Sequence, residues 1–175
     1  MPFLLAILGA MGAVIFYMIR ARNAADAAND LVGMAQDVAG AARRFGFRRK
    51  ANIHPVDAIE DVNIGIATVA NAFMESNDLP TQEMRTALQN SVRKHLNVSE
   101  EESVEMLVLA KWIQNECGGP DQAISRAGRK TARMDGARIA APLMQIVQDV
   151  AASVPNGLSP KQVDTLNDIK RIFRL

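Results

Sequence analysis

The residue types that most often carry chemistry are few in this chain and stand far apart. The sequence has two His residues, His54 and His95, and a single Cys, Cys117. One Cys cannot form an intramolecular disulfide, and two His with one Cys are too few for a Cys/His zinc site. We expect Cys117 at the C-terminus of a helix, where the helix dipole makes a thiol less acidic and less reactive. The spacing therefore predicts no catalytic dyad and no zinc centre.

Sequence motifs for catalysis and phosphate binding are also missing. The chain contains no Gly-rich phosphate loop and none of the motifs HExxH, CxxC or GxSxG. A formal net charge of +1 excludes a strongly basic nucleic-acid-binding protein of the histone type. We predict that the protein is not an enzyme and uses no cofactor.

Charged residues recur at helical spacing in two places. The acidic residues 100–102 and Glu105 fall at an expected helix start, where the helix dipole favours negative charge, so a solvated helix end explains them. The second set places basic side chains three and four residues apart, on one face of a helix. It consists of Arg126, Arg129, Lys130, Arg133 and Arg138. This face is either a solvated surface or a contact for a protein partner or a lipid headgroup.

Helices must position these residues, because composition and periodicity both favour an all-α fold. Aromatic residues make up 5% of the chain, whereas Ala, Met, Leu and Val are plentiful. After Pro55 the apolar residues repeat every three or four positions, and no alternating strand pattern is found. The sequence predicts helices over residues 56–75, 81–96, 100–116, 120–133, 137–153 and 160–173.

Local signals support several of these boundaries. The sequence Gly118-Gly119-Pro120 is suited to ending one helix and opening the next. Two further helix starts have the capping-box pattern, in which a Ser is followed three residues later by Glu or Gln. These pairs are Ser99 with Glu102 and Ser159 with Gln162.

The N-terminal part of the chain differs from the rest. Residues 3–19 contain no charged side chain, and as a helix they would extend roughly 25 Å, near the minimum that crosses a bilayer. Basic residues follow this run, so the positive-inside rule places everything after residue 20 in the cytoplasm. We expect residues 1–22 to form an uncleaved single-pass anchor with its N-terminus outside. A signal peptide and a soluble core helix are the alternatives.

Small residues four positions apart give the expected anchor a face on which two membrane helices can approach closely. They are Ala6, Gly9, Ala10 and Ala13. This spacing favours self-association, although Gly and Ala are also common in membrane helices in general.

Residues 23–55 are expected to form a helical stalk and a basic juxtamembrane segment. The basic residues surround Phe45 and Phe47, whose rings could insert at the membrane interface while the charges contact anionic lipid headgroups. The basic residues are Arg43, Arg44, Arg48, Arg49 and Lys50. We do not expect a nucleic-acid partner, because the anchor places this segment beside lipid.

Two segments of the C-terminal part are alike. Residues 77–83 and 156–162 each follow an apolar helix rich in Val and Ala, place a Leu in a short turn, and open a new helix. This repeated unit resembles the TerB-like (tellurite-resistance) family of helical domains. An anchor followed by such a domain is also similar to the membrane-proximal part of membrane-anchored DnaJ-like co-chaperones, without their J-domain. The resemblance implies a compact bundle of about six helices over residues 56–175.

The TerB-like family is thought to bind a divalent cation through an Asp and a Glu of each unit. Here Glu83 matches the Glu of the first unit, whereas Ser76 replaces the Asp. In the second unit Pro155 and Gln162 stand at the two acidic positions. A hard cation prefers several carboxylate oxygens, so we predict that the family's metal site is not inherited. The candidates for any remaining cation site are Glu75, Asp78 and Glu83.

These observations predict a non-catalytic, membrane-anchored interaction module. It would be an accessory single-pass subunit or adaptor on the cytoplasmic face of a bacterial inner membrane. Its partners would be membrane lipids, an unidentified membrane or membrane-associated protein, and a second copy of the chain. The alternative is a divalent-cation-responsive stress protein or sensor of the tellurite-resistance type.

Overall fold

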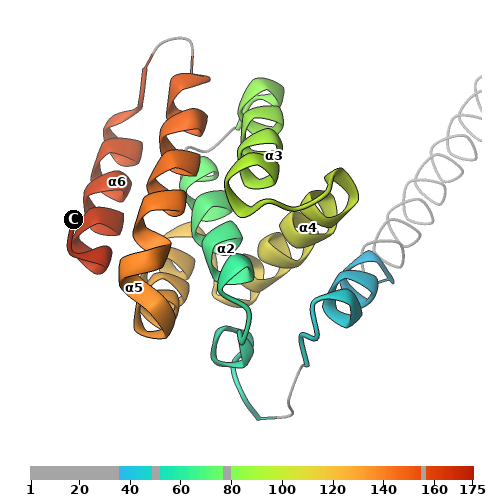
Figure 1. The fold of residues 1–175 in the computed structure, drawn as a ribbon. Helices are drawn as coiled ribbons and strands as arrows, with labels where there is room; N and C mark the ends of the chain where they lie inside the picture. Colours follow the sequence, from blue (N-terminus) through green and yellow to red (C-terminus); the bar gives the residue numbers. More distant parts are fainter. Residues whose placement is uncertain (1–35, 49–51, 77–79, 155–156) are drawn as a thin grey trace, which may run out of the picture. The chain divides into compact units, whose positions relative to one another are not determined.

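The computed structural model describes residues 36–48, 52–76, 80–154 and 157–175 (Figure 1). Within these ranges the chain forms helices and no strand, which confirms the all-α prediction. The residues from Val38 to Leu175 form one compact unit. The expected anchor, with its small-residue face, lies outside the described residues. Within the described ranges, no helix is both long and apolar enough to cross a membrane.

The helices lie close to the predicted ranges. A short 3-10 helix, η1 (Pro55–Ala58), takes up the start of the first predicted helix, so the α-helix itself begins at Val62, after Asp61 caps it. The α-helices are α2 (Val62–Met74), α3 (Gln82–Leu96), α4 (Glu100–Glu116), α5 (Pro120–Ala152) and α6 (Pro160–Phe173).

Local capping explains why these boundaries were predictable. Both predicted capping boxes are present, with reciprocal hydrogen bonds between Ser and the third helical residue at the starts of α4 and α6. Between α4 and α5, Gly118 and Gly119 have φ of +90° and +124°, a backbone conformation that residues with a Cβ rarely adopt. The helix pairs α2–α3 and α5–α6 also occupy the positions of the two repeated sequence units.

A break in the backbone of α5 separates two arms. We expected two helices with a gap between residues 133 and 137, and the structure has non-helical backbone angles at Asp135 (φ −162°, ψ 61°) within one long element. We call residues 120–134 the first arm of α5 and residues 136–152 the second arm. Side chains at helical spacing across this break need not share one face.

The core is built around α2, which is buried along almost its whole length, from Ile64 to Met74. A helix that is apolar on all sides is typical of the centre of a domain. α2 contacts α3, α4, α5 and α6, and Figure 1 shows it in the midst of them. At Gly65 the backbone of α2 comes so close to α5 that an added Cβ would lie 2.2 Å from Thr131 Oγ1. The crossing of α2 and α5 therefore depends on a glycine.

Residues 38–48 pack on the helices that follow them in the chain. Residues 38–44 are helical, Ala41 is fully buried, and Phe47 makes an edge-to-face contact with Trp112 at a centroid distance of 5.8 Å. Arg44 makes ion pairs with Glu101 (3.1 Å) and Glu105 (2.7 Å). The compact unit therefore starts earlier than residue 56. With 8% of its surface exposed, Phe47 is a core residue, so our expectation that its ring inserts into lipid is wrong for this structure.

Candidate functional site

The cation candidate Glu75 is part of a polar network between α2 and α4. Its Oε2 accepts hydrogen bonds from Lys111 Nζ and from Gln114 Nε2, the latter at 2.6 Å. Gln114 is buried, and its Oε1 accepts a hydrogen bond of 2.8 Å from Asn71 Nδ2. A lysine cation and an amide therefore already satisfy this carboxylate, and the network ties the end of α2 to α4.

The other cation candidates are placed differently. Glu83 lies exposed in the first turn of α3, and hydrogen bonds from its own backbone N–H and from the Thr81 side chain lower the pKa of its carboxyl. Asp78 lies outside the described residues. Among the residues that the structure does describe, no three His, Cys, Asp or Glu side chains gather closely enough to hold a metal ion.

We predict that divalent cations have no effect on the stability of the full chain. Removing them with a chelator, or adding millimolar Ca²⁺ or Mg²⁺, should leave the thermal midpoint unchanged, because a ligand stabilises a protein only if it prefers the folded state. Circular dichroism melts of the chain in neutral detergent measure this. A rise of several degrees that Glu75→Gln abolishes would contradict the prediction.

Three residues whose types could form a hydrolytic triad do not have the geometry of one. Asp149 Oδ2 accepts a hydrogen bond of 2.7 Å from Ser91 Oγ and lies 2.9 Å from His95 Nε2. These two contacts lower the pKa of the Asp149 carboxyl, with the Ser91 bond as the larger cause. A catalytic serine must donate to the imidazole that removes its proton, whereas Ser91 donates to the carboxylate. The arrangement joins α3 to α5, so His95 is a structural partner.

Cys117 has the surroundings of a structural residue. It is buried, ends α4, and is a free thiol. Burial raises the pKa of its thiol, which keeps the sulfur protonated and poorly nucleophilic at neutral pH.

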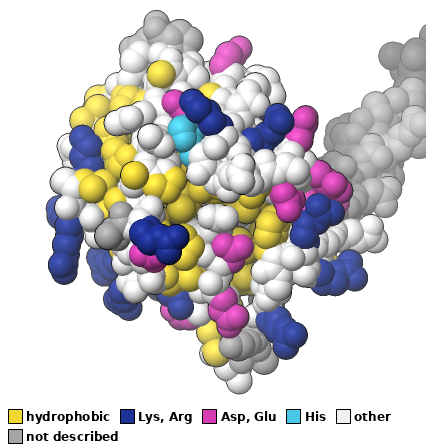
Figure 2. Space-filling view, viewed as in Figure 1, with side chains coloured by type: hydrophobic (Ala, Val, Ile, Leu, Met, Phe, Trp, Pro, Cys, Tyr) yellow, Lys and Arg dark blue, Asp and Glu magenta, His cyan; other side chains and the backbone are white. Residues whose placement is uncertain are grey.

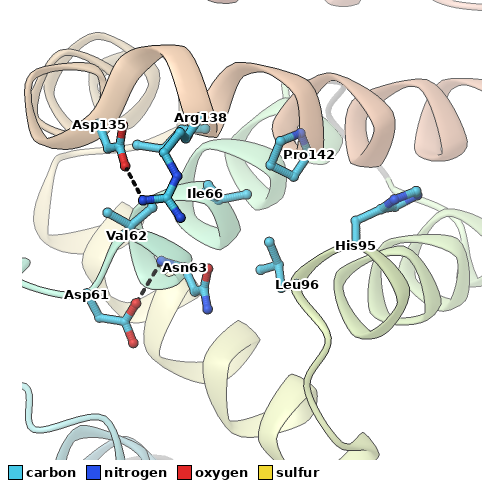
Figure 3. Close-up of a pocket in the computed structure, with 10 residues that line it drawn as sticks. Asp61, Val62, Asn63, Ile66, His95, Leu96, Asp135, Arg138 and Pro142 are labelled. Atoms are coloured by element: carbon cyan, nitrogen blue, oxygen red, sulfur yellow. Dashed lines mark hydrogen bonds and ion pairs between the residues drawn. The ribbon is translucent and has the colours of Figure 1, made fainter.

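A hollow of about 410 Å³ lies where α2, α3 and the second arm of α5 meet (Figure 3). Its polar residues mostly serve the local structure. Asp61 caps α2 by accepting a 2.8 Å hydrogen bond from the Asn63 backbone N–H, and Asp135 makes an ion pair of 3.3 Å with Arg138. Arg138 is therefore separated from the other four members of the predicted basic face, because the break at Asp135 intervenes.

Another hollow, about 270 Å³ in volume, brings those four members together. It lies between η1 with its cap on one side and the first arm of α5 on the other. We call it the basic hollow. Its lining residues are His54, Val56, Asp57, Ser125, Arg126, Arg129, Lys130 and Arg133.

The charges of the basic hollow are poorly compensated. Among the described residues, the ion pairs do not include Arg129, Lys130 or Arg133. On the face drawn in Figure 2, by contrast, basic and acidic side chains lie near one another in several places. Like charges four residues apart, such as Arg129 and Arg133, destabilise a helix by about 0.2–0.5 kcal/mol per pair. An anion in the hollow would relieve this repulsion.

Two neutral groups add hydrogen-bond donors to the lining. His54 caps η1, and its Nδ1 accepts a hydrogen bond of 3.3 Å from the Val56 backbone N–H. A neutral imidazole that accepts at Nδ1 must carry its proton on Nε2, which is then a donor. Ser125 contributes a hydroxyl. Asp57 is the only carboxylate in the described lining.

Comparison with known proteins assigns no relative. No family model, no curated protein and no solved structure matches the chain. The TerB-like resemblance thus stays a prediction, and the case for function depends on the residues themselves.

The structure brings only some of the predicted site residues together. Four of the five basic-face residues line one hollow, and sequence reasoning missed its other polar members, His54, Asp57 and Ser125. The proline after His54, suited to the first position of a helix, was the available signal. Of the expected headgroup contacts, Arg43 and Arg48 are exposed and Arg44 is paired with glutamates, while Arg49 and Lys50 lie outside the described residues.

Proposed function

We propose that the protein is a non-catalytic, membrane-anchored interaction module that binds a partner through its helical unit. The observation that carries the proposal is the basic hollow, where three arginines and a lysine line one concavity. Cations and neutral donors bind and orient an anionic group, but they supply no activated nucleophile. Ser91, Glu75 and Cys117, whose residue types could supply a nucleophile or a base, have structural roles instead.

The membrane part of the proposal is supported by the sequence. Residues 3–19 are uncharged and apolar, and seven basic residues follow within residues 20–50. This asymmetry favours an anchor whose C-terminal side is cytoplasmic. The protein would then act as an accessory single-pass subunit or adaptor on the inner face of a bacterial membrane.

Fractionation and topology reporters test the anchor. We expect the full chain to stay in the membrane pellet after a high-salt wash, and a variant lacking residues 1–20 to be released. Changing Arg43, Arg44, Arg48, Arg49 and Lys50 together to Gln should not release the chain, because an apolar helix holds it more firmly than surface charge does. A fusion to alkaline phosphatase after Leu175 that is active in the periplasm would contradict the proposed orientation.

Site-specific photo-crosslinking in membranes tests the binding part. A photoreactive residue at position 129, in the basic hollow, should give a discrete crosslinked species. The matched control carries the same residue at Arg85, an exposed position of α3. Equal crosslinking at both positions would argue against the hollow as the binding surface.

A further inference from the structure

We propose that the basic hollow is a binding site for a phosphate-bearing anion, either a lipid headgroup or a soluble phosphate compound. The inference rests on the proposed function only in taking the hollow as the binding surface. It adds the chemical class of the ligand, which follows from the donors, the charge and the shape of the hollow.

The donor set suits phosphate oxygens. Arg126, Arg129 and Arg133 present planar guanidinium groups, which match pairs of phosphate oxygens with two parallel hydrogen bonds. Lys130 adds a compact charge with three donors, and the Nε2–H of His54 and the Ser125 hydroxyl are neutral donors in the same lining. A phosphate group offers more acceptor oxygens than a carboxylate and can use several of these donors at once.

The charge of the lining also fits such a ligand. Four cationic side chains and one carboxylate, Asp57, give the lining a formal charge of +3 with His54 neutral. A phosphomonoester carries about −1.5 to −2 at neutral pH, so the lining can neutralise it completely. Arg129, Lys130 and Arg133 take part in no ion pair among the described residues, and they are therefore available to a ligand.

The shape and place of the hollow favour a compact anion over an extended acidic peptide. The cations from Arg126 to Arg133 span about 10 Å of helix, and η1 with its cap forms the opposite side of a concavity of about 270 Å³. His54 follows Arg48, an exposed member of the basic juxtamembrane segment, by six positions, which limits their Cα separation to about 22 Å. A headgroup is thus within reach if that segment lies at a membrane.

The test uses the full chain, with inorganic phosphate in neutral detergent as one arm. The other arm uses nanodiscs of phosphatidylcholine with and without phosphatidylglycerol. Each arm measures the thermal midpoint and the acylation rate of Lys130, with the exposed Lys94 as the reference within the same chain. We expect a saturable rise in the midpoint and selective protection of Lys130. Stabilisation only by phosphatidylglycerol identifies a headgroup, and stabilisation by inorganic phosphate shows that a soluble compound suffices.

A double variant of the hollow and a matched control separate site binding from general charge effects. The double variant Arg129→Gln with Arg133→Gln should weaken the affinity for the anion about tenfold or more, since each substitution removes charge-assisted hydrogen bonds. Arg85→Gln with Arg174→Gln removes the same charge from exposed positions outside the hollow and should leave the response unchanged.

Three results would overturn the proposal. They are no response in either arm, an equal effect of chloride at matched ionic strength, and protection of Lys130 by polyglutamate but not by phosphate or phosphatidylglycerol. Any of these could occur while photo-crosslinking at position 129 still captures a protein, in which case the interaction module stands and the ligand class is wrong. If phosphate binds but position 129 gives no crosslink, the ligand class stands and the interaction module is wrong.

Discussion

Replacing Gly65 by Ala is expected to destabilise the helical unit by about 1–3 kcal/mol, the usual cost of overpacking a core. The new Cβ would lie 2.2 Å from Oγ1, 2.9 Å from Cγ2 and 3.1 Å from Cβ of Thr131. Thr is branched at Cβ, so rotating its side chain cannot clear all three contacts, and α2 and α5 would have to move apart. This cost outweighs the gain of about 1 kcal/mol that Ala normally has over Gly inside a helix. Chemical denaturation of the full chain in detergent measures this loss in the free energy of unfolding.

Two further variants identify the cause. Thr131→Ala removes the two closest atoms, Cγ2 and Oγ1, and Oγ1 belongs to a buried hydroxyl that has no hydrogen-bond partner among the described residues. It should therefore restore most of the stability lost in Gly65→Ala. Gly40→Ala is the matched control, because nothing lies within 4 Å of an added Cβ there, and it should be neutral or slightly stabilising. If Gly65→Ala is as well tolerated as Gly40→Ala, the close crossing of α2 and α5 is wrong.

Replacing Gln114 by Ala is expected to cost about 2–4 kcal/mol, because it combines an unpaired buried group with lost core volume. The Asn71 amide would lose its acceptor at a position that is 5% exposed, and Glu75 would lose one of its two donors. The same denaturation experiment measures the loss. The neighbouring Asn115→Ala changes an exposed side chain and should alter stability by less than about 0.5 kcal/mol.

A double-mutant cycle separates the network from simple loss of volume. Asn71→Ala alone leaves Gln114 Oε1 without its donor, so the combined variant should cost less than the sum of the single variants, by at least about 0.5 kcal/mol. Strict additivity would mean that the hydrogen bond between Asn71 and Gln114 contributes nothing to stability.

Helix boundaries were predictable from the sequence because capping is local. The Ser99 and Ser159 boxes act over three residues, and Gly118 with Gly119 ends α4 through its own backbone freedom. The gap expected between residues 133 and 137 marked the break at Asp135, although the two arms form one element. The start of α2 was missed because η1 continues the helical pattern of the sequence.

Long-range contacts were not predictable in the same way. Helical spacing placed Arg138 with the other basic residues, yet the break at Asp135 directs it to a different hollow. His54 and the first arm of α5 are about seventy residues apart, and no local sequence signal indicates that they meet. The side of the basic hollow formed by η1 and its cap was therefore visible only in the tertiary structure. In the same way, proximity to the expected anchor suggested lipid for Phe47, whereas its partner Trp112 lies on α4.

The contact between Phe47 and Trp112 also gives the chain an optical reporter. Trp112 is the sole tryptophan of the sequence. Its indole contacts the ring of Phe47, which belongs to the basic juxtamembrane segment. Any event that lifts this segment from α4, including separation of Arg44 from Glu101 and Glu105, would expose the indole to water and shift its emission to longer wavelength. Intrinsic fluorescence of the unlabelled protein therefore reads out, at a single site, whether the juxtamembrane segment is docked.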